Sequence, residues 1–455
     1  MRVRVEPGGR VEGRIAVPGD KSIAHRWLIL AATARGTSRL AGLPGSLDVR
    51  STASCLAQVG DSKARRSLDA WASAAPPADE AHGFTWDAAA DERREREVTV
   101  EGEGRDALRK PARPLDCGNS GTTIRLLAGV LASAPFATVL TGDDSLRARP
   151  MERVAAPLRE MGATVGTTDG HAPVEIEGRA LHGIHHHLLA PSAQVKGAVL
   201  LAGLAAAGQT TVVEPAPTRD HTERALDRLG APVRSKDGTI YVAAFQHDGF
   251  EGVLPGDVSS AAFLVGAAAL TGGELEVHEV GLNPTRTHFL TVMGRMGVRV
   301  DRHVTGEALG EPLGELFVSG GEGLIGTRIE ARELPLVIDE VPVLTALAAH
   351  GVGETRFVGA GELRVKESDR LTGLADLLRG LGGHAEVEGD DLVVAGGGLA
   401  GGRADARGDH RMGMGAAVAA LGARSGCDIE GMEAAAVSFP GFVGALRALG
   451  ARVGA

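Results

Sequence analysis

Glu362-Leu-Arg-Val-Lys-Glu-Ser-Asp-Arg370 lies between two apolar segments, residues 337–349 and 371–381, that we expect to be packed helices. Seven of these nine side chains are polar and six of them are charged. Alone, such a run is typical of a solvated loop in which Ser368 and Asp369 cap the next helix. Other polar clusters of the chain also stand directly before Ala-rich segments that we expect to be helices. This repeated arrangement favours a functional site over a solvated loop.

Two helix markers recur along the chain. The first marker is an apolar residue followed by Gly, which is a common helix stop because Gly adopts the left-handed conformation freely. It ends six amphipathic runs, at Gly60, Gly162, Gly230, Gly297, Gly382 and Gly450. Polar caps open six Ala-rich helices at Asp20, Asn119, Ser192, Asp257, Asp339 and Asp409. Because the two markers stay in phase, they predict six copies of one α+β unit of about 68 residues.

Two intervals are longer than the others. The first exceeds the repeat by about 34 residues, so we place an insertion within residues 61–114, which carries Trp71, Trp86 and the charged run 91–97, and we interpret it as a surface excursion. A smaller excess of about 17 residues falls within residues 301–332. The three histidines 185–187 have no carboxylate or cysteine at a ligand-like spacing, so the sequence predicts no metal site.

Composition narrows the class of protein. The chain has 455 residues, 43% of them hydrophobic and 23% charged, which predicts a globular protein of two or more domains. A net charge of -10 argues against nonspecific nucleic-acid binding. Three cysteines without a disulfide or metal pattern, a first strand directly after Met1 and the lack of a long apolar span predict a cytoplasmic protein without a membrane partner. We also expect a monomer.

The cap positions are candidates for anion binding. The first N–H groups of a helix are unpaired and its dipole is positive there, so this end suits a phosphate or carboxylate. Basic and polar side chains gather at these starts, in residues 18–26, 116–125, 145–151, 192–196, 218–223 and 409–411. If the starts converge, they form a site for a multiply charged anion.

Taken together, the motifs resemble the 5-enolpyruvylshikimate-3-phosphate synthase family of enolpyruvyl transferases along nearly the whole chain. The motifs are Gly19-Asp-Lys-Ser22 with Arg26, Gly118-Asn-Ser-Gly-Thr122 with Arg125, Arg149-Pro-Met151, Leu363-Arg-Val-Lys-Glu-Ser-Asp-Arg370, Asp409-His-Arg411 and Ser438-Phe-Pro440. Ser192-Ala-Gln194 with Thr218-Arg-Asp-His-Thr-Glu223 is similar to the branch that uses Arg rather than Tyr near the shikimate phosphate.

The resemblance implies an α+β fold, a two-domain inside-out α/β barrel of six βαβαββ-type repeats, three in each domain. Residues 1–18 and 255–455 would form one domain and residues 19–254 the other. In this family the first strands pair with the C-terminal domain, so we place the two crossings of the chain near residues 18–20 and 254–256.

The resemblance also implies the reaction: transfer of the enolpyruvyl group of phosphoenolpyruvate to the 5-hydroxyl of shikimate-3-phosphate, with release of phosphate, by addition and elimination in the shikimate pathway. Asp339 resembles the base on the hydroxyl, Glu367 the proton carrier at the methylene carbon, and Lys21 a phosphate ligand and acid. Residues that match the shikimate-3-phosphate ligands are Lys21, Ser22, Arg26, Ser192, Ala193, Gln194, Arg219, Asp339 and Lys366. Those that match the phosphoenolpyruvate ligands are Lys21, Asn119, Gly121, Arg149, Gln194, Arg370 and Arg411. No metal or organic cofactor is implied.

Two departures from the family pattern and two alternatives stand beside this interpretation. Val437 occupies a position where one branch has a Lys that assists the phosphate, and Leu126 replaces the Pro of the most glyphosate-sensitive branch. Gly121 is the small residue associated with sensitivity, so we expect inhibition by glyphosate.

One alternative is enolpyruvyl transfer to a UDP-amino sugar, which the Ser after Lys21 and the position of Cys117 disfavour. The other is a non-catalytic anion-binding paralogue or one recruited to a specialised pathway, which the retained acidic and basic residues disfavour.

Overall fold

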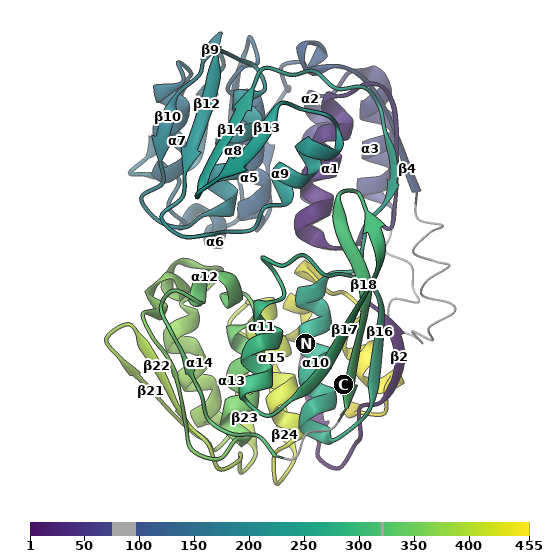
Figure 1. Cartoon of the computed structure of the whole chain (residues 1–455), viewed down its shortest axis with the longest axis vertical. Coiled ribbons are helices and arrows are strands. Elements are labelled where there is room, and N and C mark those ends of the chain that lie inside the picture. The colour runs from purple at the N-terminus through teal and green to yellow at the C-terminus, as the bar shows by residue number, and fades with distance from the viewer. Residues whose placement is uncertain (75–96, 320–322, 455) are drawn as a thin grey trace.

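The computed structural model describes residues 1–74, 97–319 and 323–454. Figure 1 shows two bodies, one above the other. Each has a buried apolar core: residues 3–17 and 258–453 form that of the lower body, and residues 23–254, with Leu309 from the lower body, form that of the upper. We call them the C-side body and the N-side body.

Six sheets share one pairing pattern, in which an edge strand is parallel to its neighbour and every other pair is antiparallel. In the N-side body the strand orders are β5 (Leu115–Asp116), β6 (Ala137–Thr141), β8 (His171–Glu177), β7 (Thr164–Thr168); β10 (His185–His187), β12 (Gln209–Val213), β14 (Thr239–Ala243), β13 (Val233–Lys236); and β15 (Glu251–Val253), β3 (Arg35–Ala41), β4 (Glu97–Glu103). In the C-side body they are β2 (Gly13–Ala16), β16 (Leu275–Gly281), β18 (Glu311–Ser319), β17 (Arg299–Ala308); β19 (Arg328–Ile329), β20 (Glu354–Phe357), β22 (Asp391–Ala395), β21 (His384–Glu388); and β23 (Gly402–Asp405), β24 (Cys427–Glu430), β1 (Val3–Glu6), β25 (Arg452–Gly454). A short parallel pair, β9 (Leu181–His182) and β11 (Ala206–Ala207), completes the strands of the described residues.

Three helices in each body are buried along most of their length: α1 (Lys21–Thr33), α5 (Gly121–Leu131) and α8 (Ala193–Gly203) in the N-side body, and α10 (Val258–Thr271), α13 (Val341–His350) and α15 (His410–Leu421) in the C-side body. Small residues let their backbones approach closely. A Cβ on Gly129 of α5 would lie 2.1 Å from the carbonyl oxygen of Ala198 in α8, so this contact requires glycine.

The remaining helices lie nearer the surface. They are α2 (Leu47–Val59), α3 (Ser62–Ser73), α6 (Asp144–Arg147), α7 (Glu152–Glu160), α9 (His221–Arg228), α11 (His288–Arg295), α12 (Leu334–Val337), α14 (Arg370–Gly380) and α16 (Phe442–Ala448), with the 3-10 turns η2 (Arg105–Ala107), η3 (Ala360–Val365) and η4 (Met432–Val437). Within the described ranges, no helix combines the length and the apolar character that crossing a membrane requires.

The chain passes between the bodies twice, and the two passages lie side by side. Gly19 and Gly256 form an antiparallel bridge, the Asp20 N–H donates to the Pro255 carbonyl (2.8 Å), and the Asp257 N–H donates to the Pro18 carbonyl (2.8 Å). As a result β2 pairs with β16 in the C-side body, while β15 pairs with β3 in the N-side body.

Most of the predicted helix markers are where the sequence places them. Asp20, Ser192, Asp257 and Asp409 are N-caps whose side chains accept from the first turn. Two predicted caps are wrong by one residue: Ser120, not Asn119, caps α5, and Glu340, not Asp339, precedes α13.

One predicted glycine stop is correct in position but not in conformation: α2 ends at Val59 and Gly60 is its C-cap, without the left-handed backbone. Gly60 has φ -70°, whereas the other five predicted glycines have positive φ. The reason is local, because the chain enters α3 at once, through Asp61, whose carboxylate accepts from the N–H groups of Lys63 and Ala64.

The longer intervals correspond to distinct features. Within residues 61–114, α3 packs on α2 and β4 pairs with β3, while Trp86 and residues 91–96 lie outside the described residues. Within residues 301–332, the hairpin β17–β18 extends upward to the N-side body (Figure 1). Its tip residue Leu309 is 7% exposed and belongs to the other body's core.

Candidate active site

A cavity of about 350 Å³ lies between the two bodies. Its walls include the first turns of α1, α5, α8 and α15 and the segments before α7, α9, α13 and α14. The N-side body contributes Lys21, Ser22, Arg26, Asp48, Gly121, Thr122, Arg125, Arg149, Pro150, Arg153, Pro191, Ser192, Ala193, Gln194, Thr218 and Arg219. The C-side body contributes Ala331, Leu334, Pro335, Ile338, Asp339, Gly359, Ala360, Glu362, Val365, Lys366, Glu367 and Arg411.

The start of α1 brings a lysine, a serine and an arginine to the cavity. Lys21 follows the cap Asp20, and its Nζ lies 2.8 Å from Asp48 Oδ2 on α2. Arg26, one turn later, donates from Nη1 to the Ser22 carbonyl (2.7 Å). Burial lowers the pKa of Arg26 to about 10, so its guanidinium stays charged at neutral pH.

A second group of polar residues surrounds the start of α5. Arg149 donates from Nη2 to Asn119 Oδ1 (2.6 Å), and Arg125 donates from Nη1 to Gln194 Oε1 (2.5 Å). Gly121 lies between the two guanidinium groups: a Cβ here would be 2.8 Å from Arg125 Nη1 and 3.2 Å from Arg149 Nη1. Arg125 has a pKa lowered to about 9, by burial first and then by Arg149. The cluster is therefore rich in positive charge and ready for an anion.

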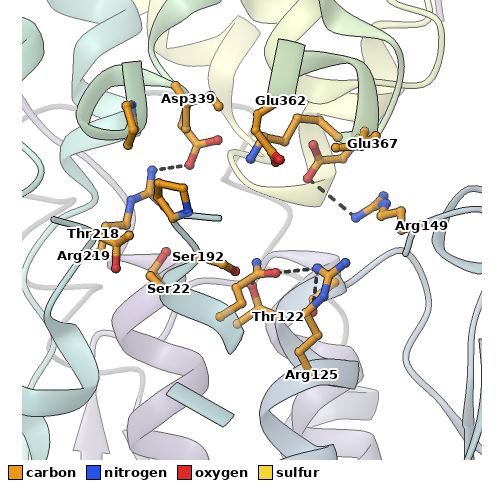
Figure 2. Close-up of a pocket in the computed structure, with 18 of the residues that line it drawn as sticks. Ser22, Thr122, Arg125, Arg149, Ser192, Thr218, Arg219, Asp339, Glu362 and Glu367 are labelled. Carbon is orange, nitrogen blue, oxygen red and sulfur yellow. Dashed lines mark hydrogen bonds and ion pairs between the residues drawn. The ribbon is translucent and has the colours of Figure 1, made fainter. Parts of the chain in front are cut away.

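Glu367 enters the cavity from the C-side body and faces cations of both bodies. Arg370 Nη2 lies 2.6 Å from its Oε2, and Arg149 Nη1 lies 3.8 Å from its Oε1 (Figure 2). Its carbonyl accepts from Ser145 Oγ (2.8 Å). Burial by itself would raise the pKa of Glu367, but Arg370 and then Arg149 outweigh it and hold the pKa well below the usual range.

Asp339 also faces the cavity from the C-side body, and it is paired with Arg219 of the N-side body (Figure 2). Arg370 Nη1 and Arg411 Nε lie 3.5 and 3.7 Å from its Oδ1. Burial opposes ionisation, yet Arg219 and then Arg411 hold the pKa of Asp339 well below its usual range. Both carboxyl groups are thus ionised at neutral pH in the unliganded protein.

The structure gathers nearly all the sequence-predicted site residues in this one cavity. Asn119 and Arg370 are the two that do not line it. Asn119 contacts Arg149, which does, and Arg370 is completely buried behind the wall, bonded to Asp409 (2.7 Å) and paired with Glu367. Val437 does not line the cavity.

Sequence reasoning assigned no role to several lining residues, above all Asp48 and Arg153. Asp48 lies in the first turn of α2, a place where an acidic residue is common for capping reasons alone. Arg153 lies 3.6 Å from Glu362 across the gap. Arg125 belongs to one of the sequence motifs of the site, but the sequence does not indicate which ligand it would bind.

The fold and the cavity fit one class of protein: enzymes of two bodies whose helix starts suit small anions, with two carboxylates and a lysine beside them. The model of the EPSP synthase (3-phosphoshikimate 1-carboxyvinyltransferase) family matches residues 5–76 and 83–446. The chain belongs to the EPSP synthase family.

Individual relatives agree with this assignment. The chain is 44% identical over 450 residues to a 3-phosphoshikimate 1-carboxyvinyltransferase of Acidithiobacillus ferrooxidans, covering 97% of this chain and 96% of that protein. It is 45% identical over 452 residues to that of Halorhodospira halophila, covering 98% and 96%. Among solved structures, EPSP synthase from Acinetobacter baumannii matches with a TM-score of 0.83 and 37% identity, covering 100% of this chain and 99% of that one.

Proposed function

We propose that the cavity between the two bodies is where the reaction of the family takes place. The enzyme transfers the enolpyruvyl group of phosphoenolpyruvate to shikimate-3-phosphate and releases phosphate, in the shikimate pathway that leads to aromatic amino acids. The observation that carries the assignment of the site is the presence of Lys21, Asp339 and Glu367 in one cavity, surrounded by cations of both bodies.

Shikimate-3-phosphate would occupy the part of the cavity next to α1, α8 and α9. Ser192 and Gln194 at the start of α8, and Arg26 and Arg219 nearby, are placed to bind its phosphate. Further ligands on the proposal are Lys21, Ser22, Ala193, Asp339 and Lys366. Arg219 and Asp339 neutralise each other as an ion pair in this part of the site. A phosphate that pairs with Arg219 instead would free Asp339 to act on the acceptor hydroxyl.

Phosphoenolpyruvate would lie next to α5 and α15. Arg149, Arg370 and Arg411 supply guanidinium groups, which bind carboxylate and phosphate in a bidentate manner. Asn119, Gly121, Gln194 and Lys21 would complete this part of the site. Arg370 would act from behind the wall, where it already holds Glu367 in place.

The proposed mechanism uses the two carboxylates in turn. Asp339 accepts the proton of the 5-hydroxyl as its oxygen attacks C2 of phosphoenolpyruvate, and Glu367 delivers a proton to the methylene carbon C3. Glu367 is ionised in the free protein, so it must first gain a proton, which binding of an anion to Arg149 and Arg370 favours by raising its pKa. In the elimination, C3 returns a proton to Glu367, the C2–O bond to phosphate breaks, and Lys21 stabilises the departing phosphate.

We also propose the finer architecture and its boundaries. The pairing pattern shared by six sheets supports six repeats, three per domain, in an inside-out α/β barrel. The two cores and the paired passages support domains of residues 1–18 with 255–455 and of residues 19–254. The monomeric state and the cytoplasmic location stay predictions.

The substitution Glu367→Gln tests the site. It keeps the shape of the side chain but removes proton transfer, so we expect kcat to fall about 100-fold or more. Glu362→Gln is a matched control, because Glu362 lines the same cavity and pairs only across the gap with Arg153 in the described contacts, and kcat should change less than about threefold. Phosphate release under saturating substrates measures both. Near wild-type turnover of Glu367→Gln would remove this residue from the mechanism.

A further inference from the structure

Arg286 is among the largest fully buried side chains, and it does not line the cavity. It lies in the loop between β16 and α11, where the N–H groups of Arg286 and Thr287 both donate to the Asn283 carbonyl (2.9 and 3.1 Å). This turn gives the side chain a fixed base. A charge at this depth is stable only with hydrogen-bonded partners of opposite sign, and those partners connect it to the active site.

Two of the partners are aspartates that cap helices of different bodies. Nη1 of Arg286 donates to Asp20 Oδ2 (3.1 Å), and Nη2 lies 3.3 Å from Asp257 Oδ1. Asp20 caps α1, whose first residue is Lys21, and Asp257 caps α10. Asp257 Oδ2 also accepts from the Lys21 N–H (3.4 Å). Arg286 therefore holds together the two passages of the chain at the point where Lys21 begins.

A third partner is at the start of α9. Nη1 of Arg286 lies 3.0 Å from Nε2 of His221. Because a guanidinium N–H only donates, Nε2 is the acceptor, and His221 is the neutral tautomer with its proton on Nδ1, from which it donates to Glu311 Oε1 (2.7 Å). His221 is the first residue of α9, two positions after Arg219. The bond thus fixes the segment that carries Arg219.

The fourth partner leads to Asp339. Nη2 of Arg286 donates to Ser259 Oγ (2.6 Å), and Ser259 in turn is hydrogen-bonded to the Glu340 carboxylate. Glu340 is 1% exposed and adjoins Asp339 in the chain. Arg286 therefore bonds directly to the neighbour of Lys21 and to the residue two positions after Arg219, and it reaches the neighbour of Asp339 through the Ser259 hydroxyl.

We propose that Arg286 is a positioning residue that sets the relative placement of Lys21, Arg219 and Asp339 around shikimate-3-phosphate. This inference rests on the roles proposed above for these three residues. Each comes from a different element, and the guanidinium is the common point to which their elements are bonded. A displacement of about 1 Å at a reacting group can cost about 100-fold in rate, so a residue that never touches substrate can control turnover.

The substitution Arg286→Lys tests the proposal. An ammonium keeps the charge but cannot bond two carboxylates, His221 and Ser259 at once. We expect kcat to fall about 10- to 100-fold and KM for shikimate-3-phosphate to rise several-fold. KM for phosphoenolpyruvate should rise less than KM for shikimate-3-phosphate, because the network reaches Lys21 but not Asn119, Gly121 or Arg149 among its proposed ligands. A role in stability alone would lower the melting temperature and leave kcat and both KM values of the folded enzyme unchanged.

Two further variants separate positioning from folding. Arg105→Lys alters a part-buried guanidinium that donates to the Leu201 carbonyl (2.8 Å) and does not line the cavity, so it should affect the melting temperature without affecting kcat. Ser259→Ala removes only the hydroxyl between Arg286 and Glu340, so it should fold and still lower kcat several-fold. Wild-type kcat and wild-type KM for shikimate-3-phosphate in Ser259→Ala and in folded Arg286→Lys would overturn the proposal. If Arg286→Lys does not fold, Ser259→Ala decides.

Asp339→Asn and Arg219→Lys, assayed beside them, distinguish this proposal from the one on which it rests. Full activity in those two variants would mean that the proposed site is wrong. Strong loss there with wild-type behaviour of Arg286→Lys and Ser259→Ala would mean that only the positioning role is wrong.

Discussion

Lys366 lies in the cavity with both carboxylates of the proposed mechanism, and its charge should contribute to the alkaline side of the pH profile, together with Arg26 and Arg125. Burial lowers the pKa of Lys366, although Asp339 and Glu367 oppose the shift. The lysine must be protonated to bind an anion, so kcat/KM for shikimate-3-phosphate should fall with rising pH at a midpoint below about 10.4, the ordinary lysine value. Lys366→Arg should move this limb to higher pH, because a guanidinium keeps its proton.

The control for this profile is Lys110→Arg, which makes the same change at an exposed position and should leave the limb where it is. Rates measured from pH 6 to about 10.5 suffice. An unchanged alkaline limb in Lys366→Arg would show that a different group controls it.

Gly121 gives a prediction about inhibition. We expect glyphosate to inhibit in competition with phosphoenolpyruvate. Gly121→Ala should weaken the binding of both glyphosate and phosphoenolpyruvate, because the new Cβ would lie 2.8 Å from Arg125 Nη1 and 3.2 Å from Arg149 Nη1. A tenfold rise in KM for phosphoenolpyruvate, about 1.4 kcal/mol, is the expected scale. Gly294→Ala is the control, since a Cβ there meets no atom within 4 Å. Full turnover of the unmodified enzyme in large excess of glyphosate would refute the expectation.

For single residues, the sequence predicts which basic side chains lie near helix starts, but not which of them are already paired with carboxylates. Lys196 follows a predicted cap and looks free in the sequence, yet its Nζ is buried between Glu214 (3.0 Å) and Glu223 (2.6 Å). Asp48, conversely, is an ordinary first-turn acid in the sequence and a partner of Lys21 in the structure. Ion pairs between distant segments depend on packing, which no local pattern contains.

Helix starts are the elements that build the site, and the start of α15 is bonded to the charged run 362–370. Asp409, which is fully buried, accepts at Oδ1 from the Arg411 N–H (3.0 Å) and at Oδ2 from Arg370 Nε (2.7 Å) and Ser368 Oγ (3.0 Å). It joins the charged run of the sequence to the next buried helix. The run is therefore both a capped helix start, through Asp369, and part of the site, through Lys366 and Glu367.

Asp409→Asn should destabilise the fold. The amide can still cap α15, but it removes the charge that faces buried Arg370, and loss of one partner of a buried pair costs about 3–5 kcal/mol. We expect about 3 kcal/mol, the lower end, because Glu367 still pairs with Arg370. Urea unfolding measures it. Asp376→Asn, at a surface pair with Arg379 and Arg407, should cost less than about 1 kcal/mol, and equal losses in both variants would contradict the argument.

Helix boundaries show how far element-level prediction reaches. Four caps and all six glycine stops are predicted at the correct residue, because each satisfies a backbone requirement that one residue type meets best. The predicted cap of α5 is wrong by one residue, since Asn119 and Ser120 are both good caps and the Asn119 side chain is bonded instead to Arg149 and Asp143. Gly60 ends α2 as predicted but lacks the left-handed conformation, because α3 follows it at once.

At the scale of the whole molecule, the two bodies are tied together in more places than the two passages of the chain. The hairpin β17–β18 places Leu309 in the N-side core, and Glu311 beside it bonds to His221 of α9. Nothing in the sequence predicted this arm, because the excess length within residues 301–332 does not say where it reaches. The contact makes the stability of one body depend on the other, and that dependence can be measured.

We expect Leu309→Ala to uncouple the two bodies in part. It removes a side chain that contacts the backbone turn at Gly252, and truncating a buried leucine costs about 2–5 kcal/mol. Trp27 lies in the N-side core and Trp71 packs against it, so their fluorescence reports the N-side body while far-ultraviolet circular dichroism reports both. The two urea transitions should coincide in the unmodified enzyme and separate in Leu309→Ala, with fluorescence changing first. Leu316→Ala, in the C-side core on the same hairpin, should instead shift the circular dichroism transition first, and coincident transitions in both variants would mean that the arm does not couple the bodies.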